Sequence, residues 1–305
     1  MTEPLNIAAS VRQRLLNHAK SQGDDYQRVL TRYAIERLLY RLCQTHARER
    51  YILKGAMLFL TWPDRAFRPT GDVDLLGYGP PEPAAMKTLF GEITAVQYPE
   101  DGIAFDTATL AVEPVREDER YQGVRITMRA RLGSAKIPVQ VDVGFGDSVF
   151  PAAERRAFPC LLTDLPAPEI LMYPRETVVA EKFEALVRFD EANSRLKDFS
   201  DIWVIIHTFA FEQATLVQAL LGTFKQRATP VPQDIPFALT PDFAALAEKQ
   251  QMWSGFLRRT TPVLVPPGLD AVLDDLRRFF TPVIAAMALP EAAHGDWNPE
   301  RQIWE

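Results

Sequence analysis

The sequence predicts an α+β fold, in which a small mixed sheet with flanking helices is followed by a helical C-terminal region. Two observations predict it. Residues 72–146 contain segments in which apolar and polar residues alternate, with one helical segment among them. Residues 7–60, and the chain after about residue 167, instead repeat apolar residues at helical spacing. We therefore expect two domains, one of helices and sheet at 1–165 and a mainly helical one at 166–305.

The first helices are predicted by apolar residues three and four positions apart, within residues 11–16 and 29–42. Between them, Gly23 is a candidate C-cap and Asp25 a candidate N-cap of the next helix. The helical pattern continues to about residue 60. Within it, Lys54-Gly55 is a candidate helix start whose backbone N–H groups would face phosphate.

Strands are expected near residues 72–78, 109–116, 121–133 and 136–146, and a helix at about 82–97. In the last strand, Val139, Val141 and Val143 alternate with Gln140 and Asp142. This is the pattern of a half-buried strand, so the valines are expected to face the core and Asp142 the opposite side.

The strand at 121–133 carries basic residues on one face, where Arg125, Arg129 and Arg131 are joined by Thr127. The opposite face is apolar. Two interpretations stay open for the basic face: a solvated strand surface, or a stripe that follows nucleic-acid phosphates.

The C-terminal half is predicted to be helical at about 176–189, from residue 197, and at 268–287. Prolines between residues 226 and 241 predict an ordered loop between helices. The tail after residue 289 has little periodicity, but Trp297 and Trp304 predict that it packs on the body of the protein.

Asp72 and Asp74 stand two positions apart, so on a strand both carboxylates point to the same face. Two neighbouring carboxylates repel each other, and a cation usually keeps both ionised. Such oxygen ligands suit magnesium, which binds through one or two carboxylates plus substrate phosphates. If the strand of Asp142 pairs beside them, the three carboxylates form a ligand set for two magnesium ions. The alternative is a surface pair without function.

Several short segments together resemble the AbiEii/AbiGii-type nucleotidyltransferase toxins, a branch of the polymerase-beta-like nucleotidyltransferase superfamily. The resemblance runs from about residue 5 to about residue 290 and rests on the order and spacing of the segments. They are Leu-Lys-Gly-Ala-Met-Leu at 53–58, Arg-Pro-Thr-Gly-Asp-Val-Asp-Leu at 68–75, Val-Asp-Val at 141–143, Ala-Glu-Lys-Phe-Glu-Ala-Leu at 180–186 and Lys-Asp-Phe-Ser-Asp-Ile at 197–202. It implies a polymerase-beta-like core for the predicted sheet.

The resemblance also implies a role for each matching residue. Asp72 and Asp74 would be catalytic metal ligands, Lys182 would reach the triphosphate, and Asp198 would be catalytic or would orient the lysine. Further positions implied are Asp142 as a third metal ligand and Lys54, Gly55, Arg68, Thr70 and Asp201 in nucleotide binding. Taken without the resemblance, Lys182 would be an ordinary surface lysine, and Asp198 an acid favoured by the dipole of a first helical turn.

The chain departs from the family pattern at two places. Relatives often have Gly-Gly or Gly-Ser where this chain has Gly55-Ala56, a change that keeps the backbone N–H groups able to cradle phosphate. Gly71 stands where many relatives carry a larger residue, which puts the substrate contacts of that loop in question.

By the same resemblance, the protein would be the toxin of a toxin–antitoxin pair of abortive-infection type, with a cognate antitoxin. It would use Mg²⁺ or Mn²⁺ to transfer NMP from an NTP to RNA, with the 3′ end of tRNA as the expected acceptor. The C-terminal domain would complete the active site. Two alternatives stay open, transfer to a protein or small molecule and a nucleotide-binding module without catalysis, because a metal site of this kind fixes the donor and not the acceptor.

Composition restricts the remaining classes. The formal net charge of −6 gives no overall attraction to nucleic acid or anionic membranes, so RNA binding would need a local patch. No apolar run of about eighteen residues and no leader-like N-terminus occur, so we expect neither a transmembrane helix nor a signal peptide. Cys43 and Cys160 lie far apart in sequence and lack a metal-ligand spacing, which favours buried thiols in a reducing cytoplasm over a disulfide. The scattered histidines argue against a zinc site.

Overall fold

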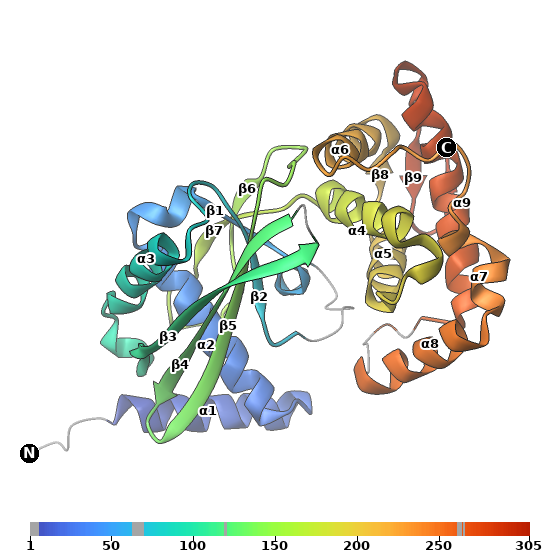
Figure 1. Ribbon diagram of the computed structural model, residues 1–305. Helices are drawn as coiled ribbons and strands as arrows, with labels where there is room; N and C mark the ends of the chain where they lie inside the picture. Colours follow the sequence, from blue (N-terminus) through green and yellow to red (C-terminus); the bar gives the residue numbers. More distant parts are fainter. Residues whose placement is uncertain (1–5, 63–69, 119–120, 261–263, 265) are drawn as a thin grey trace, which may run out of the picture. The chain divides into compact units, whose positions relative to one another are not determined.

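The computed structural model describes residues 6–62, 70–118, 121–260, 264 and 266–305, and the chain divides into two compact units (Figure 1). The first unit contains the described residues up to Trp62, together with Thr70–Gly146 and Glu154–Met172. The second contains Asp147–Ala153 and the described chain from Tyr173 onward. Within the described residues, the first unit holds a seven-stranded sheet, and the second holds helices with a three-stranded sheet.

The sheet of the first unit has the strand order β3-β4-β5-β2-β1-β7-β6. β2 pairs in parallel with β5, and β1 with β7, whereas the other neighbours are antiparallel. The sheet is therefore mixed, as predicted. Its strands are β1 (Tyr51–Lys54), β2 (Val73–Gly77), β3 (Ile103–Asp118), β4 (Tyr121–Leu132), β5 (Ala135–Phe145), β6 (Glu154–Ala157) and β7 (Glu169–Met172).

Alternation decides which face of this sheet is buried. In β5, Val139, Val141 and Val143 are buried, whereas Gln140 and Asp142 on the other face remain half-buried. On the buried side, Phe90 of α3 (Pro83–Ala95) packs edge-on against Tyr51 of β1, with ring centroids 6.2 Å apart. The face that carries Asp142 is thus left for other contacts within this unit.

The N-terminal helices are α1 (Ile7–Gln22) and α2 (Tyr26–Cys43), and the predicted caps between them are confirmed. Gly23 ends α1 in the left-handed conformation, with φ of 68°. Asp25 begins α2, where its side chain accepts a hydrogen bond from the backbone N–H of Arg28 at 2.9 Å.

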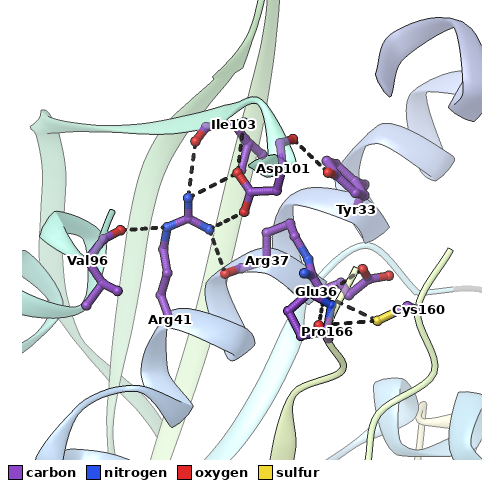
Figure 2. Close-up of polar contacts among 9 residues, drawn as sticks. All are labelled: Tyr33, Glu36, Arg37, Arg41, Val96, Asp101, Ile103, Cys160 and Pro166. Atoms are coloured by element: carbon purple, nitrogen blue, oxygen red, sulfur yellow. Dashed lines mark hydrogen bonds and ion pairs between the residues drawn. The ribbon is translucent and has the colours of Figure 1, made fainter. Parts of the chain in front are cut away.

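A buried polar network fixes α2 within the first unit (Figure 2). The guanidinium of Arg41 pairs with the carboxylate of Asp101 at 2.6 and 3.2 Å and donates to the carbonyls of Val96 and Ile103. The hydroxyl of Tyr33 donates to the carbonyl of Asp101 at 2.7 Å. A buried charge without a partner costs several kcal/mol, so this network specifies how α2 meets the segment between α3 and β3.

One helical turn earlier, Glu36 and Arg37 are fully buried and pair with each other at 2.9 Å (Figure 2). Arg37 also donates to the carbonyl of Pro166 at 2.9 Å and lies 3.3 Å from the Sγ atom of Cys160. Burial raises the pKa of the Cys160 thiol to about 11, so the thiol stays protonated at neutral pH. Cys43 and Cys160 are both free, as predicted, and Cys43 is buried, whereas Cys160 is half-buried instead of buried.

The second unit is built mainly from helices, and the chain tail packs on it as predicted. Trp297 is fully buried and donates to the carbonyl of Ile206 at 2.7 Å, and Trp304 donates to the carbonyl of Phe279 at 2.9 Å. The main elements are α4 (Arg175–Phe189), α5 (Leu196–Thr208), α6 (Gln213–Gln226), α7 (Pro241–Ala245), α8 (Ala247–Thr260) and α9 (Leu269–Ala288), with the sheet of β8 (Phe211–Glu212), β9 (Asp296–Asn298) and β10 (Ile303–Trp304).

The predicted α+β fold is confirmed, with differences at short elements. Residues 51–54 form strand β1 instead of continuing a helix, and the helix expected at Lys54-Gly55 is a 3₁₀ helix, η2 (Ala56–Thr61). β3 begins at Ile103 instead of near residue 109, and β6, β7, β8, β9 and β10 were not expected. Periodicity cannot distinguish strand from helix over so few residues. Among the described helices, none has the length and apolar character required to cross a bilayer.

Candidate functional site

A row of charged residues crosses the half-buried face of the first unit's sheet. Reading from β3 to β1, Glu113 lies opposite Arg125, Arg125 opposite Asp142, Asp142 opposite Asp74, and Asp74 opposite Lys54. Residues opposite each other on neighbouring strands share a face. The condition set by the sequence is therefore met: the strand of Asp142 pairs directly beside the strand of Asp74.

The carboxylate of Asp142 is already engaged by an arginine. Arg125 donates through Nε and Nη2 to its two oxygens, both at 2.8 Å, and Gln140 donates to Oδ2 at 3.1 Å. The pKa of Arg125 is raised above its ordinary value, first by this hydrogen bonding and further by the charges of Asp142, Asp72 and Asp74. Arg125 therefore acts as a cation within reach of all three carboxylates.

Asp72 and Asp74 lie at the start of β2 and are both half-buried. The hydroxyl of Thr70 donates to Oδ1 of Asp72. Thr70 thus supports a candidate metal ligand, in addition to being a predicted phosphate contact. Lys54, the last residue of β1, is placed opposite Asp74, so four predicted site residues gather at one end of β2. Arg68 falls outside the described residues.

Gly55 has no side chain, and this allows its backbone to approach the carboxylate of Asp74. Its φ of 68° and ψ of −164° belong to a backbone region used almost only by glycine. A Cβ atom at this position would lie 1.9 Å from Oδ2 of Asp74 and 2.6 Å from its Cγ. The backbone at Gly55 therefore approaches the carboxylate of Asp74 more closely than any side-chain-bearing residue would allow.

The residues present fit a magnesium site of two carboxylates better than one of three. No group of three or more His, Cys, Asp or Glu side chains in the described part of the chain is arranged to hold a metal ion. Both carboxylate oxygens of Asp142 accept hydrogen bonds from Arg125. Asp72 and Asp74 still satisfy magnesium, which needs one or two carboxylates when substrate phosphates and water complete its shell. The ligand roles of all three residues stay predictions.

In the second unit, Lys182 is brought together with Asp198 and Asp201. The Nζ atom of Lys182, on α4, lies 2.7 Å from Asp198 Oδ1 and 2.8 Å from Asp201 Oδ2, both at the start of α5. The two carboxylates are 1% and 2% exposed, so this lysine is not an ordinary surface residue. The structure thus links three residues that the sequence placed in the same site.

A residue that the sequence did not single out completes this cluster. Arg195 donates to the second oxygen of Asp198 at 2.7 Å. Burial pushes the pKa of Asp198 upward, but the charges and hydrogen bonds of Lys182 and Arg195 outweigh burial and hold that pKa well below its ordinary value. Asp198 is therefore an anion that fixes the lysine. Arg195 stands three residues before Asp198, a spacing that is detectable but occurs in many helices.

A cavity of about 630 Å³ lies in the first unit beside the charged row. Gln140, which donates to Asp142, lines it, and so does Gly71, which precedes Asp72. A Cβ atom at Gly71 would meet no heavy atom of the described residues within 4 Å, so these residues leave room for a larger side chain at this position.

Comparison with known proteins gives a family and two structural neighbours. The chain matches the family model described as "Nucleotidyl transferase AbiEii toxin, Type IV TA system" over residues 37–275. No curated protein matches it in sequence. A Helicobacter pylori protein provisionally assigned as a nucleotidyltransferase is 11% identical, with a TM-score of 0.49 over 90% of this chain and 96% of that chain. JHP933 from Helicobacter pylori is 12% identical, with a TM-score of 0.48 over 91% and 94%. Because the family model covers more than half of the chain, the protein belongs to the AbiEii nucleotidyltransferase toxin family of type IV toxin–antitoxin systems.

Proposed function

We propose that the protein is a magnesium-dependent nucleotidyltransferase that transfers NMP from an NTP to RNA, with the 3′ end of tRNA as acceptor, and that it acts in the cytoplasm. Membership of a toxin–antitoxin family implies an antitoxin partner. The observation that carries the proposal is the pair Asp72 and Asp74 at the start of β2, with the backbone of Gly55 against Asp74.

Each residue has a distinct part in the proposed reaction. Asp72 and Asp74 would hold Mg²⁺ or Mn²⁺, which when bound supplies positive charge to the triphosphate and to the leaving pyrophosphate. The backbone at Gly55 and the hydroxyl of Thr70 are proposed to bind phosphate oxygens. The oxygen of the acceptor hydroxyl attacks the α-phosphorus while its proton passes to water, and the bond from that phosphorus to pyrophosphate breaks, so that pyrophosphate leaves.

Lys182 is proposed to bind phosphate oxygens as a point charge. Its ammonium group is held by Asp198 and Asp201, at 2.7 and 2.8 Å, so its position is fixed before substrate arrives. Whether Asp142 becomes a metal ligand depends on Arg125, which would first have to release it. Lys54 and Arg68 complete the proposed nucleotide contacts.

The candidate site fixes the nucleotide donor and does not select the acceptor. The same donor site serves transfer to a protein or to a small molecule, and a chain that only binds nucleotide would keep the fold. Purified protein should therefore be given total tRNA, Mg²⁺ and each α-labelled NTP in turn, with a protein extract and small-molecule acceptors assayed alongside. Label in RNA supports the proposal, and label elsewhere, or nowhere, contradicts it.

The matched variants are Asp74→Asn and Asp106→Asn. Asp106 lies on β3 of the same sheet and pairs with Arg131 at 2.8 Å, so it loses the same charge outside the candidate site. We expect Asp74→Asn to abolish both the transfer of label and growth arrest in cells that express the protein. Asp106→Asn should preserve both. An equal loss of label transfer and growth arrest in the two variants would mean that the carboxylates of Asp72 and Asp74 have no special role.

A further inference from the structure

The cavity beside the charged row has the size and the lining of a ligand site. Its volume of about 630 Å³ is within the usual range for small-molecule pockets, about 300–1,000 Å³. Its wall includes Thr127 and Arg129 from β4 and Gln140 from β5. These three residues continue the face that carries Arg125 and Asp142, because side chains two positions apart on a strand point the same way.

The polar groups of this wall are available to a ligand. Within the described part of the chain, the guanidinium of Arg129 and the hydroxyls of Thr31 and Thr127 have no hydrogen-bond or ion-pair partner, although all three residues line the cavity. The neighbouring arginines on the same face are engaged, Arg125 with Asp142 and Arg131 with Asp106. Arg129 is the one charged residue among the described residues that line the cavity.

We infer that this cavity binds the ribose-phosphate part of a nucleotide. A guanidinium recognises phosphate through charge-assisted hydrogen bonds. The threonine hydroxyls both donate and accept, which matches ribose hydroxyl groups. Pro138, which is exposed and lies opposite Arg129 on the same face of the sheet, supplies apolar surface on which a sugar or base can lie.

The position of the cavity ties it to the reaction. Gly71 in its wall is followed directly by Asp72, and Gln140 bridges the wall to Asp142. The inference therefore deepens the proposed nucleotidyl transfer and rests on it for the identity of the nucleotide. Two sources offer the same chemistry, the NTP donor and the terminal nucleotide of the RNA acceptor.

Binding measured at fixed salt separates these sources without relying on turnover. Arg129→Gln removes the cavity's guanidinium, and Arg131→Gln, two residues along the same face, removes an equal charge outside it. Both side chains are exposed, so neither change threatens folding. Affinity is measured for each NTP in the presence of Mg²⁺, and for a short RNA with a free 3′ hydroxyl.

Arg129→Gln is expected to weaken one of the two ligands by about tenfold or more, the effect of losing a hydrogen bond to a charged group. Arg131→Gln should change either affinity by less than about threefold. A selective loss of NTP affinity assigns the cavity to the donor, and a selective loss of RNA affinity assigns it to the acceptor. Thr127→Val should reduce the affinity for the same ligand.

Two results would overturn the inference: unchanged affinity for both ligands in Arg129→Gln, or equal losses in Arg129→Gln and Arg131→Gln, which would indicate general electrostatic attraction. The proposed function fails separately. A chain that transfers no label yet binds NTP or RNA through Arg129 would refute nucleotidyl transfer and leave the cavity assignment intact.

Discussion

Replacing Gly55 with alanine tests whether its close approach to Asp74 builds the site. The new Cβ would lie 1.9 Å from Asp74 Oδ2, whereas real Cβ contacts essentially never fall below 3.0 Å, so the carboxylate or the backbone must move by the difference, about 1 Å. The backbone conformation at Gly55 adds strain of about 1–3 kcal/mol for any residue with a side chain.

We therefore expect Gly55→Ala to lower the free energy of unfolding by about 1–3 kcal/mol. We also expect it to weaken divalent-cation binding by tenfold or more, since a displacement of about 1 Å is large for a preorganised site. Guanidinium denaturation gives the first quantity, and titration with Mn²⁺, followed by its electron paramagnetic resonance signal, gives the second.

Gly91→Ala is the control. Gly91 lies inside α3, and a Cβ atom there would meet nothing within 4 Å, so alanine should be neutral or stabilising by up to about 1 kcal/mol without affecting Mn²⁺. If Gly55→Ala binds Mn²⁺ as tightly as the unmodified chain, the backbone at Gly55 does not position Asp74 for a metal ion.

Three further perturbations follow from buried or shared charges. Lys182→Met leaves Asp198 buried and short of a partner and should cost about 3–5 kcal/mol, whereas Lys182→Arg should retain much of the stability. Because the folded state depresses the pKa of Asp198, the free energy of unfolding should fall as pH drops below about 4. Denaturation at several pH values should show a smaller fall in Lys182→Met, which lacks the charge that lowers this pKa. Arg41→Met should cost about 3–5 kcal/mol, and adding Asp101→Leu should recover part of it; a fully additive double variant would contradict the pairing. Arg125→Ala should change stability by no more than about 1 kcal/mol, since the pair is partly exposed, yet tighten Mn²⁺ binding; unchanged Mn²⁺ affinity would show that its partner carboxylate is not a ligand.

The sequence predicted best what depends on local pattern. The alternation around Asp142 fixed both the strand and the face to which this carboxylate points, because a period of two is a property of adjacent residues. Its position beside Asp74 depends on the pairing of β2 with β5, two strands that β3 and β4 separate along the chain. Local pattern does not reveal such a pairing, so the sequence predicted it only as a condition. Strand β1 was missed because four apolar-rich residues do not distinguish strand from helix.

The arginine face of β4 shows the same limit. Two interpretations stayed open for Arg125, Arg129 and Arg131, since sequence does not reveal which carboxylates stand opposite. In the structure Arg125 pairs with Asp142 and Arg131 pairs with Asp106. Arg129 instead lines the cavity, where none of the described residues offers it a carboxylate. Identical residue types two positions apart thus have different roles because tertiary neighbours differ.

The charged row across the sheet also ties the site to strand register. Asp74 stands between the buried Val73 and Leu75, and Asp142 between the buried Val141 and Val143. A slip of one residue in either strand would place a core side chain where the carboxylate belongs. β2 pairs with β5, which is synthesised after β3 and β4. Asp142 therefore cannot join the row until β5 has emerged from the ribosome. Burial of the apolar face thus works as a check on assembly, since a chain in the wrong register cannot present the row.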